Sequence, residues 1–269
     1  MFYPCSLDLG DPAKLKRGLI VLTPAESKRL LAKAVVRLPE VQWAYANGRL
    51  AITAGTTGSF VLEELTGEKI EPHRFCVGMS AAGMLTMSLE QGRIMGRFFH
   101  QGRVVDTPYP EFLGSLDKGD VIIKGATAVD PMGNVGVLMS NPTGGAVGAM
   151  FGPASAQGIS IVTPVGLEKL IASVPDAAAG WGRLSLDYMM GVRVGLASLT
   201  SVMVVTEVEA LAVLAGVRAR LVSSGGIGGN EGAVVLLVEG PEDKVDRAIE
   251  TAEGVKGEPR IEVPAHQLS

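Results

Sequence analysis

Apolar positions along the chain follow two spacings, one typical of buried strands and the other of helices. Short continuous apolar runs occur at residues 49–54, 120–124, 134–139 and 159–163. A strand without polar alternation is typical of a parallel sheet that is covered on both faces. Residues 24–36 instead repeat their apolar positions at helical spacing, and Thr23 and Glu26 form a candidate capping box at the start of this segment.

Helical patterns alternate with these strands over the first part of the chain. They cover residues 24–36, 39–47, 60–65, 111–116, 144–156 and 165–173. Alternating strands and helices predict an α/β domain, in which an open and mostly parallel sheet carries helices on both faces. We place this domain in residues 1–180.

The pattern changes after about residue 176. Strand patterns occur at residues 201–206, 217–223 and 232–239, and helical patterns at 207–215 and 242–253. The order β-α-β-β-α predicts a smaller α+β domain of the ferredoxin-like kind, which we place in residues 181–269. The loop SSGGIGGNEG, residues 223–232, is either a flexible hairpin or a mobile lid or subunit contact.

Composition narrows the classes of partner. The chain has 269 residues, of which 47% are hydrophobic and 19% charged, with a net charge of −4 and no basic cluster, so we expect no nucleic-acid partner. No apolar run approaches the roughly 18 residues of a membrane helix, and the start does not resemble a signal peptide. The two cysteines and the scattered His73, His100 and His266 have no metal-ligand spacing. We therefore expect a cytoplasmic protein without a metal site or membrane partner.

The stretch ITAGTTGSFVLEEL, residues 52–65, combines a strand end, a glycine-rich loop and a helix start. Free N–H groups at the start of a helix bind anions, and glycines allow the backbone to approach a ligand closely. The candidate anion-binding residues are Gly55, Thr56, Thr57, Gly58 and Ser59. The alternative is an ordinary tight turn with a serine or threonine cap.

Two later loops follow strands of the same predicted sheet. They are VIIKGATAVDPMGN, residues 121–134, and MSNPTGGAVGAM, residues 139–150. Ligands of open α/β sheets bind beyond the carboxyl ends of the strands, so these loops are expected to share one site with residues 55–59. They add the candidate ligand-binding residues Gly125, Thr127, Asn141, Thr143, Gly144 and Gly145.

Lys124 and Asp130 are the candidate catalytic residues of these loops. Lys124 ends an apolar strand, where it could bind a phosphate or carboxylate or act as an amine of lowered pKa; the alternative is a surface lysine. Asp130 could act as a base or bind ribose hydroxyls, but it also begins the sequence Asp-Pro-Met-Gly-Asn, whose composition is typical of a turn.

Three segments of the chain resemble the superfamily of ribose-5-phosphate isomerase A, glucosamine-6-phosphate deaminase and the CoA-transferases. They are AGTTGSFVLEEL, IKGATAVDPMGNV and IVTPVGLEKLIAS, and the resemblance covers roughly residues 15 to 175. It implies an α/β fold with a phosphate loop at residues 55–59. The acidic Asp-Gly-Ala-Asp-Glu turn of the isomerases reads Lys-Gly-Ala-Thr-Ala at 124–128, and Asp130 alone remains of the local acids.

Taken together, these features predict a protein that binds a small phosphorylated or carboxylated metabolite, such as a sugar phosphate or a CoA-type ligand. The resemblance implies an isomerase- or transferase-like reaction if the protein is an enzyme. The alternative is a non-catalytic ligand sensor or a regulatory or assembly subunit, which the loss of the family's acids favours. We expect a homo-oligomer, and the sequence indicates no particular cofactor.

Overall fold

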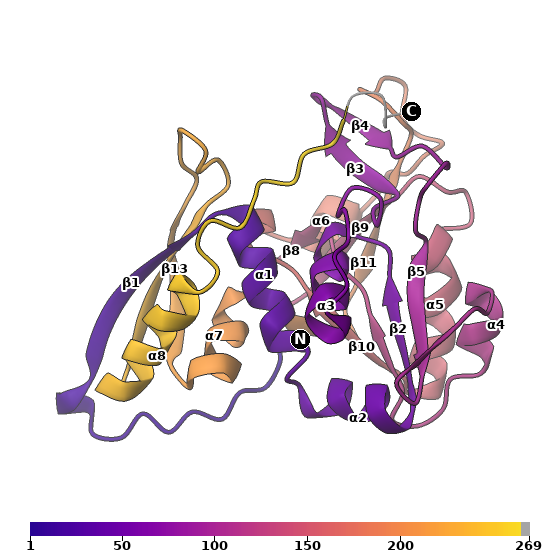
Figure 1. Ribbon diagram of the computed structural model, residues 1–269. Helices are drawn as coiled ribbons and strands as arrows, with labels where there is room; N and C mark the ends of the chain where they lie inside the picture. Colours follow the sequence, from indigo (N-terminus) through magenta and orange to yellow (C-terminus); the bar gives the residue numbers. More distant parts are fainter. Residues whose placement is uncertain (265–269) are drawn as a thin grey trace.

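A six-stranded sheet lies at the centre of the protein in a computed structural model that describes residues 1–264 (Figure 1). Its strands stand in the order β12-β10-β7-β2-β5-β6. They are β2 (Arg49–Thr53), β5 (Gly96–His100), β6 (Arg103–Val105), β7 (Val121–Ile123), β10 (Ser160–Pro164) and β12 (Met203–Val205). The first four strands in this order are parallel to one another. Strand β5 runs antiparallel to β2, and β6 runs antiparallel to β5. The predicted α/β class and mostly parallel sheet are confirmed.

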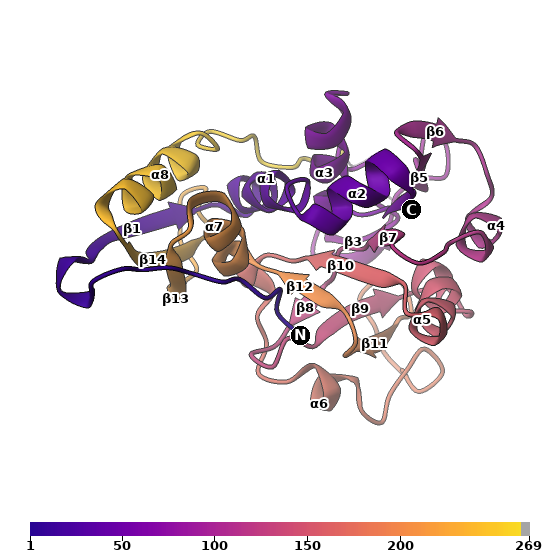
Figure 2. The same cartoon turned by 90° about the horizontal axis from the view of Figure 1, so that it is seen from below.

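Helices cover both faces of this sheet, as Figure 2 shows from below. One face packs against α1 (Pro24–Val35), α2 (Pro39–Asn47), α3 (Thr56–Thr66) and α7 (Glu207–Ala215). The other packs against α4 (Tyr109–Gly114), α5 (Gly145–Gln157) and a small sheet of β8 (Ala128–Val129), β9 (Val135–Met139) and β11 (Gly195–Leu199). Within β2, Leu50 and Ile52 face the first layer and Ala51 faces the second. Burial on both faces explains the unbroken apolar runs.

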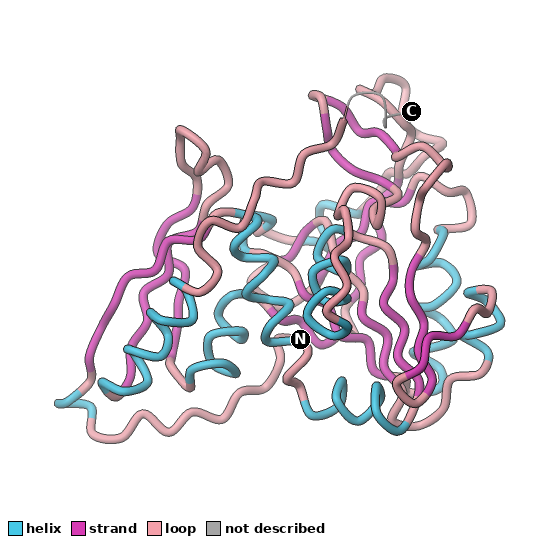
Figure 3. The backbone as a smooth tube through the Cα atoms, in the orientation of Figure 1, coloured by secondary structure: helices cyan, strands magenta, loops and turns pink. Residues whose placement is uncertain are grey.

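The parallel strands β2, β7, β10 and β12 are neighbours in the order in which the chain forms them. Their carboxyl ends therefore lie at one edge of the sheet, which is the upper edge in Figure 1. The hairpin of β3 (Gly78–Ala81) and β4 (Met84–Met87) and the loops that surround it lie beyond this edge (Figure 3). The topology thus brings together the loops that follow four different strands.

A second sheet has the order β1-β14-β13, with β1 (Lys16–Leu22), β13 (Arg218–Ser224) and β14 (Val234–Gly240). Helices α7 and α8 (Glu242–Glu253) pack on it. The strand predicted at 201–206 does not join this sheet; as β12 it pairs with β10, because Val204 and Val205 fill the two layers of the large sheet. The amino-terminal β1 pairs with β14 instead. Each sheet draws on both parts of the chain, so the ferredoxin-like domain is not confirmed, and the boundary at residue 180 stays a prediction.

The α-helix predicted at residues 165–173 is wrong. Only the short 3-10 helix η2 (Leu167–Lys169) forms there. The Ile171 N–H donates to the Val129 carbonyl, and Leu170 forms a β-bridge with the same residue. This pairing with β8 holds the segment extended. The remaining short helices are η1 (Pro12–Lys14) and α6 (Val174–Ala178). None of the helices in the described part of the chain has the length and hydropathy needed to cross a membrane.

Candidate functional site

Charged side chains gather where the parallel strands end. Lys124 follows β7, Glu168 and Lys169 lie in η2 just after β10, and Glu207 begins α7 directly after β12. Lys28 reaches them from α1, since its ammonium contacts Glu168. We call these five residues the carboxyl-edge cluster. Burial of charged side chains is uncommon, yet Lys28, Lys124 and Glu207 are only 7%, 9% and 0% exposed.

The ammonium groups of the cluster lie close to one another. Lys124 Nζ donates to the Gly125 carbonyl and Lys169 Nζ to the Ala126 carbonyl, each over 3.0 Å. Glu168 Oε1 accepts from Lys28 at 3.1 Å and lies 3.9 Å from Lys169 Nζ. Its other oxygen, Oε2, is buried without a hydrogen-bond partner among the described residues. With three lysines and two glutamates, the fully ionised cluster carries one surplus positive charge.

Burial shifts the pKa values of three groups of the cluster, Lys124, Lys169 and Glu207, in the direction that favours their uncharged forms. It lowers the pKa of Lys124 to about 8, and the nearby Lys169 ammonium adds to this effect. Burial also lowers the pKa of Lys169. Burial and the neighbouring Glu168 raise the pKa of Glu207 to about 7. Groups whose pKa is perturbed in this way concentrate at functional sites, although structural ion pairs produce similar shifts.

The amino-terminal end of α3 lies beside this cluster. A Cβ placed on Gly125 would come to 4.0 Å from the Cβ of Thr57. Gly55 is the N-cap, and no side chain caps the helix. The first intrahelical bond runs from the Ser59 N–H to the Gly55 carbonyl, so the amides of the preceding turn have no acceptor within the helix. Such an end carries partial positive charge and favours an anion.

Two other helices that start at the same edge are capped at their amino-terminal ends by side chains. Thr23 and Glu26 form a capping box on α1, and Thr206 and Glu209 form one on α7. These boxes satisfy the first amide groups of α1 and α7. Gly55 gives α3 no side-chain cap, and the Thr56 N–H interacts with the Cys76 thiol. The candidate anion site is therefore confined to α3 among these three helices.

Cys76 lies against the same helix end. It is 7% exposed, and its thiol donates to the Gly78 carbonyl at 3.2 Å. Burial raises the pKa of the Cys76 thiol, although the Lys124 ammonium and the Thr56 N–H act in the opposite direction. The thiol is thus a neutral neighbour of the lysine pair.

The predicted anion-loop residues differ in what they offer a ligand. Gly55 and Thr56 are partly exposed, whereas Thr57, Gly58 and Ser59 are buried. The Ser59 hydroxyl donates to the Thr56 carbonyl at 2.7 Å. Recognition of an anion would therefore depend on backbone amides more than on the serine hydroxyl.

The other predicted ligand-binding residues form local contacts. The Thr127 hydroxyl donates to the Gly136 carbonyl and accepts from the Leu138 N–H, which ties it to β9. Asn141 Oδ1 accepts from the Thr143 N–H and hydroxyl in the turn before α5. Gly144 and Gly145 have φ values of 80° and 56° and form the turn into that helix. These contacts are local and structural, and of this group only Gly125 adjoins the amino-terminal end of α3.

Asp130 is 1% exposed and its carboxylate is fully engaged. Oδ1 accepts from the N–H groups of Met132 and Asn134, and Oδ2 accepts from Asn134 Nδ2 and the Val174 N–H, over 2.9 to 3.0 Å. These bonds hold the pKa of Asp130 below its usual range. The geometry matches the turn interpretation of this residue and gives it no free oxygen for proton transfer.

Most residues of the carboxyl-edge cluster were not predicted as site residues from the sequence. Lys28, Glu168, Lys169 and Glu207 were not among the candidate residues. The signal was present, because Glu168 and Lys169 follow the apolar run ISIVT and Glu207 follows SVMVVT. Lys124 was selected because ligands of open α/β sheets bind beyond the carboxyl ends of the strands, and the same reasoning applies to these two strand ends.

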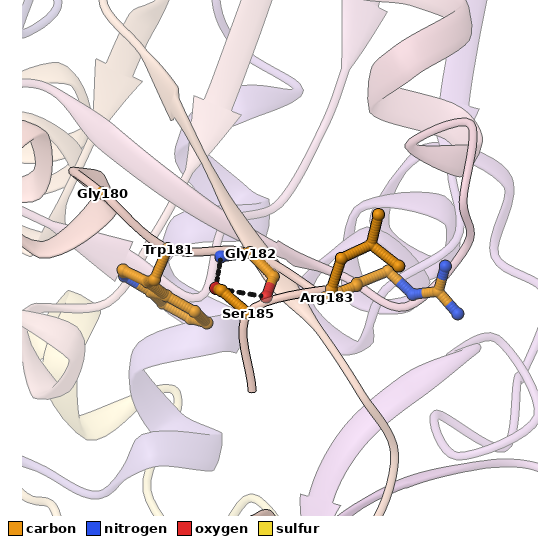
Figure 4. Close-up of a pocket in the computed structure, with 6 residues that line it drawn as sticks. Gly180, Trp181, Gly182, Arg183 and Ser185 are labelled. Carbon is orange, nitrogen blue, oxygen red and sulfur yellow. Dashed lines mark hydrogen bonds between the residues drawn. The ribbon is translucent and has the colours of Figure 1, made fainter. Parts of the chain in front are cut away.

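Two cavities lie away from the carboxyl-edge cluster. One, of about 570 Å³, is lined by Gly180 to Ser185, where the Ser185 hydroxyl bonds the backbone of Gly182 (Figure 4). The other, of about 580 Å³, is lined by residues between Met95 and Tyr109. Within residues 1–264, no group of three histidine, cysteine or acidic side chains is arranged to hold a metal ion. His266 lies outside the described residues.

Comparisons of the chain with protein-family models, curated proteins and solved structures found no match. The likeness to the isomerase, deaminase and CoA-transferase superfamily therefore stays a prediction from the sequence.

Proposed function

We propose that the protein binds a small phosphorylated or carboxylated metabolite at the carboxyl edge of its central sheet. The observation that carries this proposal is the position of Lys124 and Lys169, two mostly buried ammonium groups that lie beside the uncapped end of α3. An anion placed there would receive amide N–H groups from the helix and positive charge from the lysines.

The charge balance of the cluster supports an anionic ligand. Three lysines face two glutamates, and burial raises the pKa of Glu207 to about 7, which reduces the negative charge further near neutral pH. Buried charges are stable only when they are paired. A phosphate or carboxylate would supply the missing negative charge.

If the protein is an enzyme, the proposal includes an isomerase- or transferase-like reaction on a sugar phosphate or CoA-type ligand. Lys124 is retained as a candidate catalytic group, and Asp130 is not. Glu207 becomes the candidate proton carrier, since a carboxyl group with a pKa near 7 is suited to general acid–base work at neutral pH.

The second candidate is a non-catalytic sensor or a regulatory or assembly subunit. The specific observation in its favour is that Asp130, the one acid left from the isomerase turn, is bound by four hydrogen-bond donors. In this case ligand binding would stabilise the protein without turnover. Both candidate functions are compatible with the cytoplasmic location and the homo-oligomer expected from the sequence. These two expectations stay predictions.

A thermal-shift screen tests the binding proposal. It should contain inorganic phosphate, sugar phosphates, CoA and small carboxylates. A ligand at about 100 times its dissociation constant adds about 2.7 kcal/mol, which corresponds to roughly 5 to 10 °C for a chain of this size.

The control compares two lysines at opposite ends of β7. Lys124→Met should abolish most of the ligand-induced shift, while Lys118→Met, at an exposed position before the strand, should leave it unchanged. Equal shifts in wild type and Lys124→Met, or no shift with any anion, would contradict the proposal.

A further inference from the structure

We propose that Lys124 is a nucleophilic amine that forms an imine with an aldehyde or ketone carrying a phosphate group. The inference rests on the proposed function, because it assigns a chemical class to the ligand of the same site. It follows from how the three lysines of the carboxyl-edge cluster differ in their partners.

Lys124 is the lysine of the cluster that has no carboxylate partner in the described residues. Lys28 and Lys169 both contact Glu168 Oε1, at 3.1 and 3.9 Å. Lys124 Nζ instead donates to the Gly125 carbonyl, which is a neutral acceptor. An ammonium that is 9% exposed and has no counter-ion is the one most easily converted to the neutral amine.

Burial of Lys124 favours this conversion, and its two titratable neighbours act in opposite directions. Lys169, in η2, carries the same charge and donates to the Ala126 carbonyl, two residues after Lys124. Cys76, from the segment before β3, would act in the opposite direction in its thiolate form, because a thiolate attracts the Lys124 ammonium. Burial and Lys169 together lower the pKa of Lys124 to about 8, against 10.5 for an ordinary lysine. This corresponds to roughly 300 times more neutral amine at pH 7.

The residues near Lys124 also indicate which other chemical group the ligand carries. Gly125, whose carbonyl accepts from Lys124, adjoins Thr57 in the first turn of α3. A phosphate at the amides of that turn would lie close to the amine, so the carbonyl carbon must be only a few bonds from the phosphate. A short phosphorylated aldehyde or ketone fits both requirements. Lys169, whose Nζ lies 3.9 Å from Glu168 Oε1, would contribute to binding the phosphate.

The reaction balances without an oxidant or a reductant. The lone pair of neutral Nζ forms a C–N bond as the C–O π bond breaks, and a proton moves from nitrogen to oxygen to give a carbinolamine. The carbinolamine then loses its oxygen as water, together with the second Nζ proton, and a C=N bond remains. A lysine desolvated beside another cation is a recognised form of activated nucleophile.

Borohydride trapping tests the inference on the full chain. The probe is dihydroxyacetone phosphate, and sodium borohydride adds hydride to the C=N carbon and fixes the adduct as a secondary amine. Peptide mass spectrometry should find the adduct on Lys124 at least about tenfold above the exposed Lys118. Equal labelling of the two lysines, or labelling of Lys169 alone, would overturn the assignment.

The pH dependence separates a lowered pKa from simple proximity. Lys169→Met removes the neighbouring positive charge, so the pKa of Lys124 should rise and trapping at pH 7 should fall, by about tenfold for each unit. Raising the pH should restore it. Lys118→Met should leave the profile unchanged. A profile that Lys169→Met does not move would contradict the role of the lysine pair.

Glycerol 3-phosphate distinguishes failure of this inference from failure of the proposed function, because it has the phosphate without the carbonyl. Stabilisation by glycerol 3-phosphate with no trapped adduct from dihydroxyacetone phosphate would overturn imine formation and leave anion binding intact. No stabilisation and no adduct would overturn both. Stabilisation by both compounds, with an adduct on Lys124 that glycerol 3-phosphate suppresses, is the expected result.

Discussion

Lys124 and Lys169 donate to the carbonyl oxygens of consecutive residues, Gly125 and Ala126, over 3.0 Å each. The peptide dipoles of one loop therefore hold two like charges together at the carboxyl edge of the sheet. Such an arrangement is unfavourable for folding, because each ammonium loses hydration and repels the other. Sites that bind ligands commonly retain interactions that reduce stability.

Lys124→Met should therefore stabilise the protein at pH 7. The pKa of Lys124 is lowered to about 8 in the folded state, so its destabilising effect is fully present below pH 8 and disappears as the pH rises above 10.5. We expect a gain of about 2 kcal/mol at pH 7 after the loss of one hydrogen bond. Urea unfolding at pH 7 and pH 10 measures it. A variant less stable than wild type at pH 7, or a gain as large at pH 10 as at pH 7, would contradict this prediction.

Glu207→Gln should stabilise the protein at alkaline pH. Burial raises the pKa of Glu207 from 4.5 to about 7, so wild type loses stability as the pH rises through this range and the loss remains above pH 7. The neutral amide should be more stable than wild type by on the order of 3 kcal/mol at pH 8 and by little at pH 4. Thermal unfolding across this range gives the difference. The exposed Glu250→Gln is the control and should show no such trend.

Arg29→Met should destabilise the packing of α1 against α3. Arg29 contacts Glu63, Glu64 and Glu258 over 2.6 to 3.0 Å and lies 4.5 Å from the Phe60 ring centroid. Removing it leaves three mostly buried carboxylates without this partner, which costs about 3 to 5 kcal/mol.

Chemical denaturation measures the effect of Arg29→Met, and Arg103→Met on the exposed edge strand β6 is its control. The control should change stability by less than about 0.5 kcal/mol. Equal effects of the two substitutions would show that the Arg29 contacts are not stabilising.

Asp130→Ala should destabilise the protein without a direct effect on the proposed ligand site. The substitution leaves the N–H groups of Met132, Asn134 and Val174 without their acceptor, at a cost of about 3 kcal/mol. Because the pKa of Asp130 is lowered on folding, its contribution is present above the unfolded pKa and is lost as the pH falls through the folded value. The deficit should thus shrink in acid. A normal ligand-induced thermal shift in the folded variant would confirm that Asp130 is structural. Loss of this shift in a variant that still folds would show that Asp130 contributes to ligand binding.

Local signals in the sequence predicted the local structure well. The capping box of Thr23 and Glu26 forms as expected, with bonds of 2.9 and 3.4 Å between them. The apolar runs of β7 and β10 are buried on both faces because their alternate residues enter two different hydrophobic layers. These features depend on residues close together in the chain, so periodicity and capping chemistry reveal them.

Long-range pairing could not be predicted from the same patterns. Nothing in the residues of β1 indicates that its partner is β14, more than 200 residues later. An apolar strand such as β12 fits the edge of either sheet, and only the packing of Val204 and Val205 decides between them. The contacts of Glu207 with the Leu167 N–H depend on that choice, which is why this part of the cluster was missed.

The roles of individual glycines also could not be predicted from the sequence. Gly58 was predicted as part of an anion-binding loop, and a Cβ at this position would lie 2.7 Å from the Thr53 carbonyl oxygen. The glycine is therefore required for the close approach of α3 to the end of β2, whether or not a ligand binds. Gly55, with a φ of 155° and open space around it, is required for its backbone conformation. A single sequence does not distinguish these uses.

Mapping of backbone amide chemical shifts by NMR, with glycerol 3-phosphate as the probe, tests the central claim most directly. We expect the largest changes at Thr56, Thr57, Gly58 and Gly125. Lys124→Met should reduce these changes, and Lys118→Met should not. Changes confined to the cavities at 95–109 or 180–185, or no changes at saturating probe, would contradict anion binding at the carboxyl edge of the sheet.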